Sequence, residues 1–180
     1  MYLSGNMTVS GDLSLSGTDL FIEDDVQSKP MGLTVKGALR LKDYHSYQSL
    51  AVTGKLSAAS LYAEDTALYV FNKQKSQKAS LTGKDVTNVL KNADMYVTGS
   101  LAVTGNFELR GKSTLYVYDL AKGAAMNMSV KGTMSLNTDN EVWVSGNLSA
   151  GNMILNGGSI HLSSPKLQTI KVGNTLAFTD

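Results

Sequence analysis

The stretch that decides the fold is Met95 to Gly111, MYVTGSLAVTGNFELRG, in which a glycine recurs at every sixth residue. The glycines are Gly99, Gly105 and Gly111, and apolar residues stand at alternate positions between them. The first seventeen residues, MYLSGNMTVSGDLSLSG, have the same spacing. A fixed period that occurs at two separate places indicates a repeat architecture rather than the irregular turns of an ordinary globular domain.

The alternation between the glycines has the period of a β-strand. Val103 and Leu109, for example, each stand four residues after a glycine. This period places the apolar side chains on one face, and glycine tolerates the sharp turn that would end each strand. We expect about six residues a side and three sides a coil, with the apolar face inward. The predicted fold is all-β, a right-handed β-solenoid (β-helix), and a flat sheet of hairpins is the alternative.

A longer repeat divides the chain into two copies of a unit of about 90 residues. Met1 begins the first copy as Met95 begins the second, and apolar positions correspond through most of both. The deletions between the copies keep the inward parity, as expected if a stacked core must be preserved. We therefore predict one solenoid unit over residues 1–94 and a second unit over residues 95–180.

Residues 72–94 interrupt the pattern of the first unit. The segment is rich in lysine, and Val86, Val89 and Leu90 have the spacing of one helix face. Asp85 precedes them as a candidate N-cap. We interpret the segment as a lysine-rich insertion that contains one short helix.

The composition argues against several classes of protein. Lys and Arg number 16 against 15 Asp and Glu, so we expect no nucleic-acid partner. The chain has no cysteine, which excludes disulfides, thiolate metal sites and cysteine nucleophiles. No run approaches the about 20 apolar residues that span a bilayer, so we expect no membrane insertion. Met1 stands in mid-pattern, which predicts a piece of a longer fibre or an end that docks on another subunit.

No motif in the sequence predicts catalysis, a metal or a cofactor. Two acidic clusters, Glu23–Asp25 and Glu64–Asp65, offer paired carboxylates, but the second unit repeats neither pair. A solvated corner is therefore the favoured interpretation of both. The two histidines are His45, in a polar loop, and His161, at an outward strand position, which is no zinc or triad constellation. We expect a non-enzymatic chain without a cofactor.

Aromatic residues are the candidate binding feature of this sequence. By strand parity six of them point away from the core, where exposed apolar rings are costly unless something covers them. They are Phe21, Tyr69, Phe71, Tyr116, Tyr118 and Trp143. One interpretation is a strip that stacks on sugars or binds a partner. The favoured one is that loops or a neighbouring copy of the chain cover the rings.

Two runs of the sequence resemble a known kind of repeat. SGNMTVSGDLSLSG (4–17) and VTGSLAVTGNFELRG (97–111) resemble the Gly-x-Leu-x-Val-x-Gly repeats of bacteriophage tail fibres and other virion fibre proteins. Similar runs occur in bacterial surface adhesins and in bactofilins. Bactofilins look like more uniform coils without a lysine-rich insertion, and adhesin passengers look richer in Gly and Asn. The likeness to phage fibres is the one we favour, and it implies a structural or host-binding role in a virion.

We therefore expect a non-enzymatic structural or binding rod, of the kind of a phage virion fibre or surface-decoration protein. Its expected partners are further copies of the chain or other virion or surface subunits, with cell-surface carbohydrate as a further candidate. A fragment of a bacterial surface adhesin is the alternative, and a polysaccharide-acting solenoid enzyme is the third hypothesis. Three chains wound together as one fibre would fit the same pattern. The expected location is the virion or the cell surface.

Overall fold

The structure is a computed structural model that describes residues 1–23, 29–43, 48–72, 77–118, 124–164 and 168–179. Within these ranges the chain consists of strands, turns and bends, without a helix. The strands form two sheets, one of eight strands and one of twelve. Neighbouring strands pair in parallel throughout both sheets. The prediction of an all-β fold is confirmed.

The eight-stranded sheet follows the order of the chain. Its strands are β1 (Tyr2–Leu3), β4 (Leu20–Ile22), β6 (Gln48–Val52), β8 (Thr66–Val70), β11 (Asp94–Val97), β14 (Thr114–Val117), β16 (Glu141–Val144) and β18 (Ser159–Leu162). The twelve-stranded sheet contains the other strands. In this sheet two consecutive short strands pair with successive parts of one longer strand, as β2 and β3 pair with β5. These strands are β2 (Met7–Val9), β3 (Leu13–Ser16), β5 (Leu33–Lys42), β7 (Leu56–Glu64), β9 (Ala79–Leu81), β10 (Thr87–Lys91), β12 (Leu101–Val103), β13 (Asn106–Arg110), β15 (Met128–Leu136), β17 (Leu148–Leu155), β19 (Ile170–Val172) and β20 (Leu176–Phe178).

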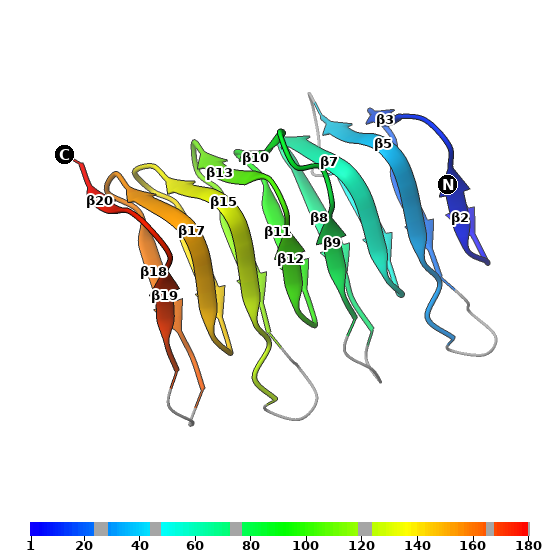
Figure 1. The fold of residues 1–180 in the computed structure, drawn as a ribbon. Coiled ribbons are helices and arrows are strands. Elements are labelled where there is room, and N and C mark those ends of the chain that lie inside the picture. Colours follow the sequence, from blue (N-terminus) through cyan, green and yellow to red (C-terminus); the bar gives the residue numbers. More distant parts are fainter. Residues whose placement is uncertain (24–28, 44–47, 73–76, 119–123, 165–167, 180) are drawn as a thin grey trace.

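The chain passes from one sheet to the other and back. Each strand of the eight-stranded sheet is followed by one or two strands of the twelve-stranded sheet, and we call such a set a rung. Figure 1 shows the rungs side by side in chain order, with the N-terminus at one end and the C-terminus at the other. Parallel pairing in both sheets joins each rung to the next, so most contacts are between neighbouring rungs.

Apolar residues at alternate strand positions form one continuous core that takes side chains from both sheets. In β4, Leu20 and Ile22 are buried, and Phe21 between them faces the other way and is half-buried. Val103 and Leu109 are 2% and 0% exposed, so the inward orientation predicted for both is confirmed. Burying a side chain of this size stabilises the fold by about 1.5–3 kcal/mol, which makes the stacked core the main source of stability.

The connections that leave the eight-stranded sheet alternate in length. Four of them have three residues each: 4–6, 53–55, 98–100 and 145–147. Between these come connections of seven to ten residues: 23–32, 71–78, 118–127 and 163–169. Each short connection begins at the third residue of a four-residue motif. The motif consists of an aromatic residue or alanine, then Leu or Val, then Ser or Thr, then Gly, and it begins at Tyr2, Ala51, Tyr96 and Trp143. The rungs therefore repeat in pairs, with a period of about 47 residues, inside the predicted unit of about 90.

Each later short connection packs on the longer connection of the rung before it. Thr53 Oγ1 accepts a hydrogen bond from Met31 N at 3.2 Å and donates one to Ile22 O at 3.2 Å. The next residue must lack Cβ, because a Cβ on Gly54 would lie 2.6 Å from the backbone of Met31. The hydroxyls of Thr98 and Ser145 likewise accept one backbone N–H and donate to one backbone carbonyl of the preceding rung, although the partner positions differ. A Cβ on Gly99 or Gly146 would also overlap the backbone of the preceding long connection. The Ser/Thr-Gly pair thus joins consecutive rungs at this corner.

The short helix predicted behind Asp85 is wrong. Thr87–Lys91 form strand β10, which pairs with β7 and β13. Asn88 points into the core, where its amide accepts a hydrogen bond from Leu61 N at 2.9 Å and donates one to Asn106 O at 2.9 Å. A polar residue at this inward position interrupts the alternation of apolar and polar residues that is typical of a strand. The neighbouring apolar residues Val86, Val89 and Leu90 therefore have the spacing of a helix face, although Val89 and Leu90 lie in a strand.

Candidate functional site

The outer face of the eight-stranded sheet carries a row of aromatic residues. The register of the sheet places one residue of the row on each rung, in the order Tyr2, Phe21, Ala51, Tyr69, Tyr96, Tyr116, Trp143 and His161. These positions have the parity opposite to that of the core residues, so their side chains point away from the core. We call the row the aromatic ladder, and Ala51 is its one position without a ring.

Most neighbouring rings of the ladder stack on one another. The ring centroids of Tyr69 and Tyr96 lie 4.9 Å apart and those of Tyr96 and Tyr116 lie 4.8 Å apart, with nearly parallel planes. Trp143 lies 6.3 Å from Tyr116 and 3.9 Å from His161. Aromatic pairs of this kind contribute about 0.5–1.5 kcal/mol beyond the burial of their surface. The rings therefore cover part of one another, which lowers the cost of leaving them outside the core.

Four of the six aromatic residues that strand parity predicted to point outward belong to the ladder. They are Phe21, Tyr69, Tyr116 and Trp143. The other two, Phe71 and Tyr118, each stand two residues after a ladder ring, and Tyr118 contacts Tyr116 edge-on at a centroid distance of 6.1 Å. The structure thus brings five of the six predicted residues into contact with another ring on this face, namely Phe21, Tyr69, Tyr116, Tyr118 and Trp143.

Sequence reasoning missed three ring-bearing members of the ladder as site residues: Tyr2, Tyr96 and His161. Met95 and Val97 on either side of Tyr96 are buried, so strand parity alone could have assigned this ring to the outer face. Strand parity cannot predict which rings stack on one another. The stacking partners depend on the register between rungs, and no local sequence pattern contains that register.

Burial within the ladder raises the pKa of two of its tyrosines, Tyr96 and Tyr116. Loss of hydration, followed by the nearby Asp94 carboxylate and by Tyr116, raises the pKa of Tyr96 to about 12. Burial also raises the pKa of Tyr116. Trp143 Nε1 donates a hydrogen bond to Glu141 Oε2 at 3.0 Å. The carboxylates of Asp94 and Glu141 stand two residues before Tyr96 and Trp143 and so lie along one edge of the ladder.

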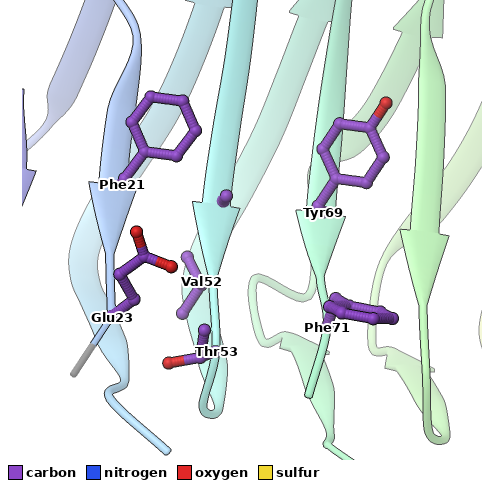
Figure 2. Close-up of a pocket in the computed structure, with 7 residues that line it drawn as sticks. Phe21, Glu23, Val52, Thr53, Tyr69 and Phe71 are labelled. Carbon is purple, nitrogen blue, oxygen red and sulfur yellow. The ribbon is translucent and has the colours of Figure 1, made fainter. Parts of the chain in front are cut away.

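A pocket interrupts the ladder at Ala51. On one side Tyr2 stacks on Phe21 at a centroid distance of 4.7 Å, and on the other side the longer stack begins at Tyr69. The alanine methyl leaves a space of about 220 Å³ between the two stacks. Figure 2 shows Phe21 and Tyr69 on the two sides of this space. Its remaining lining comes from Glu23, Val52, Thr53 and Phe71.

Of the two acidic clusters, the one at Glu64 has a structural role. Glu64 is 7% exposed, and its carboxylate accepts bonds from Lys91 Nζ at 2.6 Å, Lys42 Nζ at 3.0 Å and the Tyr62 hydroxyl at 3.0 Å. The two lysines lie opposite Glu64 in the neighbouring rungs. The bond to Lys91, then that to Lys42, lowers the pKa of Glu64 to about 2. This ion pair joins three rungs and leaves no free carboxylate at Glu64 for acid–base chemistry.

Glu64→Gln should make the fold less sensitive to acid. In the unfolded chain the pKa of Glu64 is near 4.5, and in the folded chain it is about 2. The stability that this carboxylate contributes is therefore complete above pH 4.5 and is lost as the pH falls through 2. At pH 7 the substitution should lower the free energy of unfolding by about 1–3 kcal/mol, and near pH 2 by much less. Urea unfolding at both pH values measures this difference.

Glu108→Gln is the matched control for Glu64→Gln. Glu108 pairs with Arg110 of its own strand at 2.7 Å, and both side chains are more exposed than Glu64. An exposed pair of this kind contributes about 0–1 kcal/mol, so this variant should unfold almost as the unchanged protein does. Equal losses in the two variants at pH 7 would contradict the structural role of Glu64.

Some residues named in the sequence predictions lie outside the described residues. They are Asp24 and Asp25 of the first acidic cluster, His45, and residues 73–76 of the lysine-rich segment. Within the described ranges no group of three or more His, Cys, Asp or Glu side chains could hold a metal ion. In the same part of the chain, no helix has the length and apolar character needed to cross a membrane.

Comparison with known proteins gives no relative for this chain. No protein-family model, no curated protein and no solved structure matches it. The function therefore has to be argued from the sheets, the ladder and the exposed surfaces of the chain itself.

Proposed function

We propose that the chain is a β-solenoid in which each rung is one coil. The support is the constant passage between two parallel sheets together with the register that places each rung directly on the one before. In β5 the pairing shifts between Val35 and Ala38, and in β15 between Val130 and Thr133, as expected for a strand that turns a corner of the coil. Two parallel sheets with one shared core fit this arrangement better than a flat sheet of hairpins, whose strands would pair antiparallel.

We further propose that the solenoid is a non-enzymatic rod whose copies stack end to end. The observation that carries this proposal is the apolar surface of the outermost rungs. Ile170, Leu176 and Phe178 of the last rung are 46%, 50% and 74% exposed, and they line a hollow of about 620 Å³. At the other end Met1 and Tyr2 are 68% and 71% exposed. An exposed apolar patch of this kind favours a covering partner.

A second copy of the chain fits these ends because rungs with short and long connections alternate along the chain. The last rung has a long connection, and each earlier rung with a long connection is followed by a rung with a short connection. The first rung has that short connection, and a Cβ on its Gly5 would meet no atom within 4 Å, in contrast to Gly54. The first rung of one copy therefore has open space where a long connection packs elsewhere. Stacked copies would continue the two-rung period and pair the open strand edges.

A rod that grows by stacking agrees with the virion fibre or surface-decoration role implied by the glycine repeats. In that role the lateral face of each copy stays accessible, and the aromatic ladder lies on that face. Because the rings of the ladder stack on one another, they offer their edges to a ligand, and the tyrosines among them add hydroxyl groups that can hydrogen-bond to cell-surface carbohydrate. We propose this contact as the lateral binding function of the rod.

Light scattering on the purified chain tests the stacking. The unchanged protein should form dimers or longer assemblies whose mass rises with concentration. Phe178→Asp should be monomeric, because a carboxylate in the end surface would be buried without a partner. Ala102→Asp, at an exposed lateral position of β12, should assemble like the unchanged protein. A monomeric unchanged protein, or a Phe178→Asp variant that assembles equally well, would contradict end-to-end stacking.

A further inference from the structure

We propose that the pocket at Ala51 binds an organic ammonium cation of the choline type, in which methyl groups surround a positively charged nitrogen. The pocket belongs to one chain and to its lateral face, so this site is independent of the stacking proposed above. Three aromatic rings, Phe21, Tyr69 and Phe71, and one carboxylate, Glu23, take part in its lining. Aromatic rings around a methylated ammonium are a known recognition mode, because the ring faces are electron-rich and also bury the methyl groups.

The spacing of the ladder sets the width of the pocket. Rings on neighbouring rungs have centroids 4.7–4.9 Å apart where they stack without a gap. Phe21 and Tyr69 are two rungs apart, so about 9.6 Å separates their places in the ladder. A nitrogen midway between them, over Ala51, would lie about 4.8 Å from each ring, within the about 6 Å over which a ring face attracts a cation. The missing ring thus leaves a space of the size that one such group needs.

The charge of the pocket favours a cation. Figure 2 shows the Glu23 carboxylate directed into the space beside Phe21 and Val52. Among the residues that the structure describes, no Lys, Arg or His forms an ion pair with Glu23. A carboxylate next to apolar rings, with no cationic partner in the described part of the chain, is a favourable neighbour for a positive ligand.

The other polar groups of the pocket argue against a sugar as its occupant. The Thr53 hydroxyl already donates to Ile22 O and accepts from Met31 N. A sugar ring carries several hydroxyls, and each one buried without a partner lowers affinity. Besides Glu23 and Thr53, Tyr69 is the one lining residue with a side-chain oxygen. One carboxylate among three rings therefore matches a single positive charge with an apolar surface better than it matches a polyol.

Isothermal titration calorimetry with choline chloride at low ionic strength tests the site. The unchanged protein should bind one choline per chain with a Kd of about 1 mM or tighter. Dimethylbutanol, the uncharged carbon analogue of choline, should bind at least tenfold more weakly, and so should glucose. Equal binding of the uncharged analogue would overturn the proposed recognition of charge, and tighter binding of glucose would overturn the choice of ligand.

Two substitutions place the ligand in this pocket. Ala51→Tyr inserts the missing ring of the ladder and should abolish choline binding, whereas Ala102→Tyr, at an exposed alanine of the other sheet, should leave the affinity unchanged. Glu23→Gln keeps the shape of the pocket, removes its charge and should weaken binding at least tenfold. Circular dichroism on each variant confirms folding, and Glu23→Gln decides the matter if Ala51→Tyr does not fold. Retained choline affinity in Glu23→Gln would overturn the proposal.

Discussion

Replacing Gly99 by alanine should lower the melting temperature of the protein by about 6–12 °C. Gly99 belongs to a short connection that packs on the longer connection of the preceding rung, and a Cβ at this position would overlap the backbone carbonyl oxygen of Gln77. Gln77 N also donates a hydrogen bond to Thr98 O at 2.9 Å, so neither segment can move away without losing a contact. An overpacked site of this kind costs about 3 kcal/mol. Thermal unfolding followed by circular dichroism measures the change.

Gly5→Ala is the matched control for Gly99→Ala. Gly5 occupies the same place in the motif, but a Cβ there would meet no atom within 4 Å. Neither glycine has the positive φ that would itself disfavour alanine. Both alanine variants are made in the monomeric Phe178→Asp background, in which no second copy packs on the first rung. The melting temperature of the control should then change little, because a surface substitution without new contacts alters stability by about 0.5 kcal/mol or less. If both alanine variants melted alike, the packing of short on long connections would not be what requires glycine.

The features that could be predicted from the sequence are those that repeat locally. Strand parity identified the inward side chains, such as Val103 and Leu109, because a strand has a period of two whatever its neighbours are. The same rule failed at β10, where Asn88 is buried and satisfied by two backbone groups. A polar residue in the core looks like a polar residue at the surface when only the sequence is known. The strand was therefore mistaken for a helix.

The candidate site depends on features that are not local. Parity predicted that Phe21 and Tyr69 point outward, but their spatial relation through Ala51 follows from the register between rungs. That register is set by connections of alternating length, which shift the chain by different numbers of residues from rung to rung. The short motif that begins at Tyr2, Ala51 and Tyr96 contains the missing signal, because alanine replaces a ring in one copy. The replacement forms a pocket because the stacked rungs place Ala51 between the rings of Phe21 and Tyr69.

Val103→Asp should prevent folding. Val103 is 2% exposed and lies in β12, opposite Leu81 of one neighbouring rung and Val130 of the other. All three side chains belong to the continuous core, so a carboxylate at this position would have apolar neighbours only. Burying an unpaired carboxylate costs several kcal/mol, which is comparable to the whole stability of a domain of this size. The variant should be insoluble or should lack the β-sheet signal in circular dichroism.

Ala102→Asp separates the effect of position from the effect of charge. Ala102 is the preceding residue of the same strand, and it is exposed because the strand turns successive side chains to opposite faces. An added carboxylate there stays in water and should leave the β-sheet signal and the melting temperature nearly unchanged. A folded, soluble Val103→Asp variant would contradict the inward orientation of this strand. Because the parallel register propagates from rung to rung, that result would also contradict the orientation of its neighbours in β9 and β15.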